Sequence, residues 1–397
     1  MLIKRLVNFF ASTALLLASA FSLAQGVPSS TPPDPILVGT TQSLSGRFQE
    51  EGREQLEGLS MWVDDINSRG QLLGRPVKLI YYDDHSAAVE VTKLYERLIV
   101  EDQVDLLIGP YGSELTLAAT DVAERYDRPI LTAAASAEKI WSRGYRNVFG
   151  IDVPASNYMD IAVQEAAARG ARTAGLFYAT GEFAEDVARG VRRKLQEYDV
   201  ELVFEQQYTT NTEDFATLAQ SLVAAEDQID VLFGATYLAD SVTIAKAMGA
   251  GKRLQVDMVA LTVGPAILEF RTMLNNDVDG VVGVVQWLRS VRFPGAQDFA
   301  YRFRTMHGSN PGVHAAIGYS AGQVTEAAVR LANSTAPDRV REQLGTLRFR
   351  SLLGHYRVDE TGRQIGKRNY LLQWQEGHRR LVAPAEIAER ELIYPRP

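Results

Sequence analysis

Short β-branched or aromatic runs alternate with helix-length amphipathic runs along this chain, and this alternation constrains the fold more than any other feature. In the first series, strands are expected at residues 36–40, 77–82, 104–108 and 129–131, and helices at 50–68, 87–100 and 113–126. The first helix repeats apolar residues at helical spacing, namely Leu56, Leu59, Trp62, Val63 and Ile66. Strands that alternate with single helices indicate a parallel sheet covered on both faces.

The same alternation restarts in the middle of the chain. Strands are expected at 173–178, 201–207, 229–233 and 256–261, with helices at 183–197, 215–225, 240–248 and 266–274. The stretch Phe149–Pro154 separates the two series. Two doubly wound sheets are therefore predicted, and a single eightfold β/α barrel is the alternative.

The C-terminal part of the chain favours two lobes over the barrel. A glycine-rich strand at 280–287 is followed by helices at 298–307 and 314–332, for which a closed barrel has no place. Strands at 354–358, 370–375 and 380–382 are separated by tight turns and are expected to be antiparallel. The predicted fold class is α/β, with two doubly wound parallel-sheet lobes between which the chain crosses more than once.

The first residues have the pattern of a secretory signal peptide. Lys4 and Arg5 precede an apolar run from Leu6 to Leu17, and small residues lead to an expected cleavage site after Ala24. The apolar run is shorter than the ~20 residues of a spanning helix, and an uncleaved membrane anchor is the alternative. Residues 25–35 are rich in Pro and Ser and are expected to be an extended linker.

The composition limits which cellular compartments and which binding partners are expected. The chain has no cysteine, which excludes a disulfide framework and an N-terminal lipid thioether and fits a soluble periplasmic protein. Loss of Lys4 and Arg5 with the signal peptide changes the net charge from −8 to −10, which argues against nucleic acid as a partner. The five histidines are scattered, so neither a metal nor a cofactor is expected.

Ser113 lies between a strand and a helix in the stretch IGPYGSELT, where a serine can cap the helix, attack a substrate or bind an anion. A nucleophile at such a turn is flanked by glycines two residues before and two after it, but these positions hold Tyr111 and Leu115. Anion binding is favoured over catalysis, because a helix N-terminus at the carboxyl end of a parallel strand offers free N–H groups and a positive dipole. Helix capping stays open as the simpler role.

A second loop, Thr132–Ala137, follows the next strand and consists of small residues with hydroxyls at Thr132 and Ser136. Loops at the carboxyl ends of neighbouring parallel strands can converge on one crevice. The loops around Ser113 and Ser136 are therefore a candidate ligand site, and two unrelated turns are the alternative.

The run INSRGQLLGRPV at 66–77, followed by Tyr82-Asp83-Asp84, resembles the leucine/isoleucine/valine family of periplasmic binding proteins. These are type I solute receptors for ATP-binding-cassette (ABC) importers. The resemblance runs from about Ile36 to Val382 and includes VDLLIGP at 104–110 and DFATLAQSL at 214–222. It implies a soluble, monomeric receptor without enzymatic activity. Such a receptor binds a small carboxylate ligand and delivers it to a permease in the inner membrane.

The same resemblance assigns site residues one by one. Ser113 matches the serine that holds the ligand carboxylate, and Ala134 and Ser136 match positions that contact the carboxylate and the ammonium. Tyr237 and Phe183 match aromatic residues of the second lobe that close over the ligand. Tyr111 and Phe48 lie on neighbouring loops and are expected to extend the aromatic wall, with ordinary core packing as their alternative.

One position departs from the family pattern. Amino-acid receptors of this family place a glutamate after the strand that ends near Leu261, where it pairs with the ligand ammonium, but here Thr262 stands at or beside that position. Because a buried ammonium needs an anionic partner, either another acid such as Asp152 substitutes or the ligand has no ammonium. An aromatic or other hydrophobic carboxylate is the competing ligand, and a sensor role competes with transport.

The expected division of the chain follows from these patterns. Residues 1–24 form the signal peptide and 25–35 the linker. Lobe 1 comprises 36–150 with 288–350, and lobe 2 comprises 151–284 with 351–397.

Overall fold

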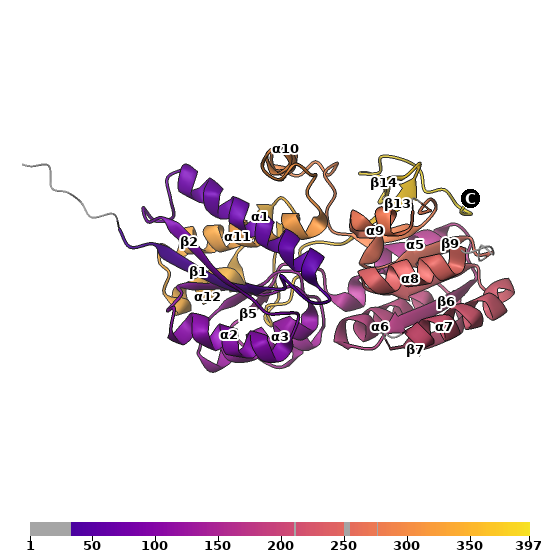
Figure 1. The fold of residues 1–397 in the computed structure, drawn as a ribbon, viewed down its shortest axis with the longest axis horizontal. Helices are drawn as coiled ribbons and strands as arrows, with labels where there is room; N and C mark the ends of the chain where they lie inside the picture. The colour runs from indigo at the N-terminus through magenta and orange to yellow at the C-terminus, as the bar shows by residue number, and fades with distance from the viewer. Residues whose placement is uncertain (1–32, 210–211, 250–254, 276) are drawn as a thin grey trace, which may run out of the picture. The chain divides into compact units, whose positions relative to one another are not determined.

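A computed structural model describes residues 33–209, 212–249, 255–275 and 277–397. The expected signal peptide and most of the linker lie outside the described residues. Residues Pro35–Pro397 form one compact unit with two main sheets (Figure 1). The eightfold-barrel alternative is wrong, because the strands are divided between two sheets instead of closing into one.

The first sheet consists of five parallel strands in the order β2-β1-β3-β4-β5. The strands are β1 (Ile36–Gln42), β2 (Val77–Asp83), β3 (Leu106–Ile108), β4 (Ile130–Thr132) and β5 (Val148–Gly150). Its helices include α1 (Gln49–Ser68), α2 (Ala88–Val100), α3 (Ser113–Arg125), the short α4 (Lys139–Ser142) and α11 (Val313–Ala332). In Figure 1, α2 and α3 cover one face of this sheet, and α1 and α11 cover the other.

The second sheet has seven strands in the order β14-β13-β10-β9-β8-β6-β7. Its parallel strands are β6 (Thr173–Ala179), β7 (Glu201–Tyr208), β8 (Val231–Ala235), β9 (Met258–Leu261) and β10 (Val282–Val285). The strands β13 (Tyr370–Gln375) and β14 (His378–Ala383) extend it as an antiparallel hairpin, as predicted for the C-terminal strands. Its helices are α5 (Asp160–Ala168), α6 (Glu182–Glu197), α7 (Thr212–Ala225), α8 (Leu238–Gly249) and α9 (Glu269–Met273).

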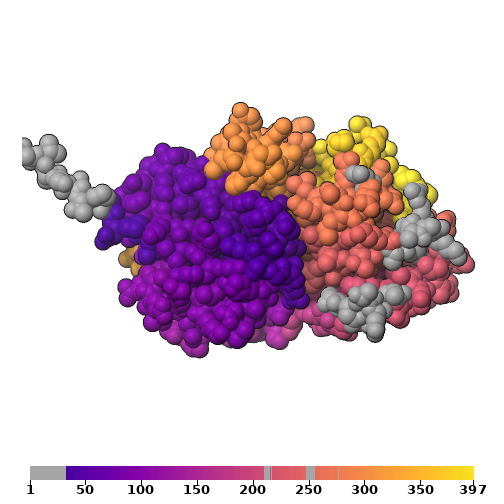
Figure 2. All heavy atoms as spheres, viewed as in Figure 1, coloured from indigo at the N-terminus to yellow at the C-terminus, as the bar shows by residue number. Residues whose placement is uncertain are grey.

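The chain crosses between the two sheets after β5, after β10 and again before β13. After β10 it forms α10 (Ala296–His307), α11 and α12 (Pro337–Thr346), and α11 packs on α1 of the first sheet. The short antiparallel pair β11 (Phe349–Ser351) and β12 (Gly354–Tyr356) precedes the return to the second sheet. On the face shown in Figure 2, the surfaces built on the two sheets meet without an open groove between them.

Several elements were not predicted from the sequence. β5 has only three residues, too few to show an alternating pattern, and α5 is rich in alanine, which weakens its contrast between faces. The helix predicted at 266–274 begins only at Glu269, because Ile267 has extended backbone angles that interrupt it after a 3-10 turn at Gly264–Ala266. α12 was overlooked although Pro337 stands at its first position.

Glycine allows α1 and α11 to approach closely. A Cβ atom added to Gly58 would lie 1.8 Å from the Ala315 carbonyl oxygen, whereas one added to Gly345 in α12 would have its nearest neighbour at 3.6 Å. We expect Gly58→Ala to lower the free energy of unfolding by about 1–3 kcal/mol, as overpacking does. Gly345→Ala should be neutral or stabilising by up to about 1 kcal/mol, because alanine favours the helix. Urea denaturation compares the two variants, and similar midpoints would contradict the close approach of α1 and α11.

Candidate functional site

A cavity lies where the carboxyl ends of strands from both sheets meet. It contains about 460 Å³ of space between atoms, part of it continuous with solvent. Its lining comprises Tyr111, Gly112, Ser113, Ala134, Ala135, Ser136, Asp152, Tyr158, Phe183, Tyr237, Val263, Gln286, Val313, His314 and Ile317. The edge outside the carboxyl ends of parallel strands is where open α/β sheets bind ligands.

The structure brings most of the residues predicted for the site together in this cavity. The lining includes Tyr111, Ser113, Ala134, Ser136, Phe183 and Tyr237. Phe48 is not in the lining, and its ring packs behind it, with its centroid 5.2 Å from that of Tyr111 and 5.7 Å from that of Tyr237. Phe48 therefore supports the wall of the cavity.

Thr262 is the other predicted residue that the cavity lining does not include. Its hydroxyl donates to the Thr236 carbonyl at 2.5 Å and accepts the Thr236 N–H at 2.8 Å. These bonds join the loops after β8 and β9. The Thr262 hydroxyl is thus used within the second lobe, and the structure does not place it in the lining of this cavity.

Ser113 is the first residue of α3 and projects from the helix end. Its Oγ accepts the backbone N–H groups of Ser136 and Ala137, both at 3.1 Å. The position before the helix is occupied by Gly112, with φ of 86°, and no side chain caps the helix. Helix capping by Ser113 is therefore wrong, and with its oxygen accepting two bonds, the hydroxyl proton is available to a ligand acceptor.

Asp152 is the acidic residue in the lining and lies directly beyond β5. Burial raises the pKa of Asp152 to about 6, although Lys367, a hydrogen bond from the Ser136 hydroxyl and the Val153 N–H all favour the charged form. Burial also lowers the pKa of Lys367 to about 8, and Asp152 opposes that change. The cavity thus contains a carboxylate that lacks full solvation, beside the loop that carries Ser136.

Six aromatic rings form a continuous run at the cavity, five of them in its lining and Phe48 directly behind it. Successive centroids are 5.0 to 5.9 Å apart along the series His314, Tyr111, Phe48, Tyr237, Phe183 and Tyr158. The run crosses from one lobe to the other between Phe48 and Tyr237, because the rings before that point belong to the first lobe and those after it to the second. The wall is complete only while the lobes are together.

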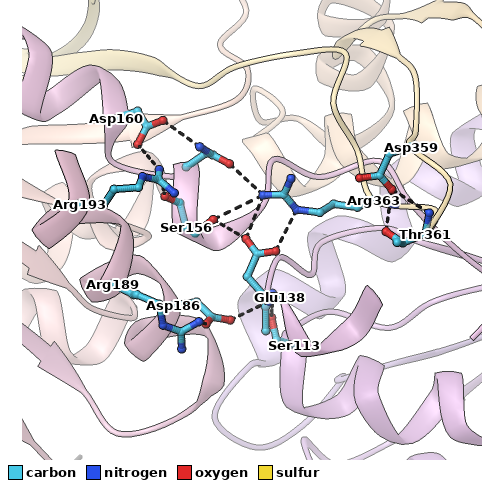
Figure 3. A network of polar contacts seen from close by, with 12 residues as sticks. Ser113, Glu138, Ser156, Asp160, Asp186, Arg189, Arg193, Asp359, Thr361 and Arg363 are labelled. Carbon is cyan, nitrogen blue, oxygen red and sulfur yellow. Dashed lines mark hydrogen bonds and ion pairs between the residues drawn. The ribbon is translucent and has the colours of Figure 1, made fainter. Parts of the chain in front are cut away.

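A polar network fixes the 134–136 loop to both lobes (Figure 3). The Glu138 carboxylate accepts two bonds from Arg363, at 2.9 and 3.1 Å, and one from the Ser156 hydroxyl. The backbone N–H of Glu138 donates to Asp186 of α6 at 2.7 Å. Burial raises the pKa of Asp186, which is 2% exposed. Asp186 thus bonds the loop that follows β4 to the helix that carries Phe183.

The sequence did not single out Tyr158, Gln286 or His314 as site residues. Gln286 directly follows β10, so the rule that identified the Ser113 and Ser136 loops also applies to it. His314 lies in the first turn of the long helix α11. From the sequence alone, a histidine at that position is expected to pack like the helix residues around it. Its place in the lining depends on the docking of α11 against α1.

A metal site and a membrane-spanning helix are two further features that would bear on function in the described part of the chain. No group of His, Asp or Glu side chains there is arranged to hold a metal ion. In the same residues, no helix is both long enough and apolar enough to span a bilayer.

Comparison with known proteins identifies the family. A family model described as "Periplasmic binding protein" matches residues 35–379. The Leu/Ile/Val-binding protein homolog 7 of Brucella melitensis is 24% identical, over 96% of this chain and 98% of that protein.

Solved structures share the fold. The branched-chain amino acid transporter substrate binding protein LivJ of Streptococcus pneumoniae, in complex with isoleucine, has a TM-score of 0.78 at 18% identity, covering 88% of this chain and all of that chain. An ABC transporter solute binding protein of R. palustris, in complex with benzoate, has a TM-score of 0.77 at 20% identity, covering 90% of this chain and 99% of the other. The chain belongs to the periplasmic binding protein family and has its two-lobed, type I fold.

Proposed function

We propose that this protein is the periplasmic receptor of an ABC importer and captures an amino acid, branched-chain or related, by closing its lobes. The assignment of an amino acid as the ligand rests on one observation. The cavity presents a hydroxyl donor, Ser113, and a buried carboxylate, Asp152, on either side of the loop that carries Ser136. A donor and a carboxylate so placed match the carboxylate and the ammonium of a zwitterion.

Ser113 is proposed to hold the ligand carboxylate without attacking it. Its oxygen already accepts two backbone N–H groups, which orients the O–H toward the cavity. The first turn of α3 adds N–H groups that have no partner within the helix. Charge-assisted hydrogen bonds of this kind contribute about 1.5–3 kcal/mol each, so the ligand should be recovered unchanged after binding.

Asp152 is proposed to replace the glutamate that the family places after β9. The Asp152 carboxylate is 5% exposed, and its pKa is raised because Lys367 and the hydrogen bonds to Asp152 offset the cost of burial only in part. A ligand ammonium supplies the rest of that compensation. This role would account for the departure at Thr262 and supports an amino acid as the ligand.

The lobes are proposed to move as rigid bodies about the crossing segments, with boundaries at 36–150 with 288–350 and at 151–284 with 351–397. Bonds made only in the closed form, such as the one from Glu138 to Asp186, then shift the population toward closure. A permease in the inner membrane is proposed to recognise and bind the closed form. Delivery to the periplasm is assigned to the signal peptide at 1–24.

We expect Asp186→Ala to weaken ligand binding roughly 5- to 30-fold, because the closed form would then contain an unsatisfied, partly buried N–H at Glu138, at a cost of about 1–2 kcal/mol. Isothermal titration calorimetry measures the affinity, and small-angle scattering with saturating ligand measures the compaction. Glu182→Ala is the control, since its ion pair with Lys139 also joins the lobes but is exposed and such pairs contribute about 0–1 kcal/mol. Equal losses in both variants would argue against a specific role of Asp186.

Thermal-shift screening of amino acids, their methyl esters and aromatic carboxylates tests the proposed function. A ligand that binds only the native state raises the melting temperature. At least one free amino acid should stabilise the protein, and its methyl ester should not. Stabilisation by no amino acid, or equal shifts from acid and ester, would refute the proposal.

The second candidate is a receptor for an aromatic carboxylate. The run of rings from His314 to Tyr158 favours it, and the R. palustris structural relative is described in complex with benzoate. Such a ligand would bring a second negative charge near Asp152 and should therefore bind more tightly below pH 6, where that carboxyl is protonated. An amino acid should show the opposite trend.

A further inference from the structure

His314 is a buried polar side chain in the cavity wall that the binding of a zwitterion does not use. It is 6% exposed and lines the cavity from the first turn of α11, between Val313 and Ile317. Its Nδ1 is buried without a hydrogen-bond partner. The groups proposed for the carboxylate and the ammonium lie elsewhere, at the ends of β3, β4 and β5.

The surroundings of His314 favour different roles for its two ring nitrogens. Nδ1 lies 3.7 Å from the Glu54 carboxylate, which is itself buried. A carboxylate behind an imidazole favours the tautomer with the proton on the near nitrogen. Because Tyr111 packs against the ring at a centroid distance of 5.0 Å and an angle of 87°, the imidazole is also held in orientation. Nε2 is then the nitrogen left to accept a hydrogen bond from the cavity.

From this arrangement we infer that the ligand is an amino acid whose side chain carries a neutral hydrogen-bond donor, a hydroxyl or a carboxamide, that reaches His314. This inference rests on the proposed function and names its substrate class. An aliphatic side chain would cover His314 and leave a buried polar group unsatisfied, which is unfavourable. An acidic side chain at His314 would place a negative charge near Glu54 and the buried Glu51, which both interact with His314.

Calorimetric titration with matched pairs of amino acids tests the inference. Threonine is compared with valine and asparagine with leucine, because the members of each pair have nearly the same shape, and glutamine is compared with glutamate. We expect the best ligand to be a neutral polar member and to bind at least tenfold more tightly than its aliphatic or acidic counterpart.

Two variants link that preference to His314. His314→Phe keeps a ring against Tyr111 but removes the acceptor, and it should reduce the polar preference to less than threefold. His314→Gln keeps hydrogen-bonding capacity and should retain the preference. Melting curves without ligand establish that each variant is folded, and if His314→Phe does not fold, the titrations of the unmodified protein with the three pairs decide alone.

Tighter binding of valine, leucine or glutamate than of the polar counterpart would overturn the inference while leaving the amino-acid receptor intact. An unchanged polar preference in a folded His314→Phe would also overturn it. Binding of no amino acid at all would instead overturn the proposed function, so the two failures are distinguishable.

Discussion

Replacing Asp152 with asparagine is expected to weaken the binding of an amino acid about 100-fold or more. Removing one member of a buried ion pair costs about 3–5 kcal/mol, because the other charge is left without a partner. In this cavity the unpartnered group would be the ligand ammonium. Calorimetric titration of the unmodified protein and of Asp152→Asn with the same ligand measures the loss.

A ligand without an ammonium provides the control for Asp152→Asn. The deamino analogue of the same amino acid should bind the unmodified protein weakly and should bind the variant at least as well, since the carboxylate that repels it is gone. If the variant loses affinity for both ligands alike, Asp152 supports the cavity without contacting the ammonium.

The pH dependence of binding gives a second measurement on the same group. Because the pKa of Asp152 is raised to about 6, its carboxylate is charged at pH 7.5 and largely protonated at pH 5. An amino acid should therefore bind about tenfold more weakly at pH 5, following a slope of tenfold per pH unit below the pKa. Asp152→Asn should remove this dependence.

The raised pKa of Asp152 also predicts how the stability of the unliganded protein changes with pH. Since the folded pKa of Asp152 lies above its ordinary value of 3.8, this group stabilises the fold most below pH 4, and that contribution is lost as the pH rises through about 6. Asp152→Asn should flatten the change in melting temperature between pH 4 and 7. A steeper change in the variant would contradict the burial of a carboxyl whose charge is only partly compensated.

Replacing Ser113 with alanine is expected to weaken ligand binding roughly 30- to 150-fold, or about 2–3 kcal/mol. The variant loses the O–H donor to the ligand carboxylate, and it also leaves the N–H groups of Ser136 and Ala137 without their acceptor. Calorimetry on Ser113→Ala measures the affinity, and the melting temperature separates the loss of loop order from the loss of the ligand contact.

Comparison of the free acid with its methyl ester isolates the contact made by Ser113. The unmodified protein should prefer the acid strongly, and Ser113→Ala should show a much smaller preference, as a double-mutant cycle requires of interacting groups. Thr120→Ala in the same helix is the control, because its hydroxyl donates within α3 at 2.8 Å and is far along the helix from the cavity. An undiminished preference in Ser113→Ala would place the ligand carboxylate elsewhere.

The sequence was most informative where a pattern is local. The alternation of runs identified most strands and helices, and the rule that ligands bind at the carboxyl ends of parallel strands led to Ser113 and Ser136, whereas Tyr237 came from the family resemblance. The same rule could have identified Gln286, which directly follows β10. Short elements such as β5 and the alanine-rich α5 lacked a periodic signal.

The roles of individual side chains depended on contacts between distant segments. Thr262 stood where an acid was expected, yet its hydroxyl is used by Thr236. Phe48 was assigned to the wall and lies one layer behind it. Neither outcome can be predicted from the position of the residue in the sequence. That position places a residue near the carboxyl edge of a sheet, but it does not specify which neighbour the side chain contacts.

The sequence by itself determined the α/β class, the two series of strands and the loops that border the cavity, because periodicity and strand ends are properties of neighbouring residues. Only the tertiary structure decided that Asp152 and five of the six rings, His314 among them, line one cavity and that Phe48 and Thr262 lie outside its lining. Burial and hydrogen-bond partners arise when segments far apart in the chain pack together, and those contacts set the charge of Asp152 and the orientation of His314.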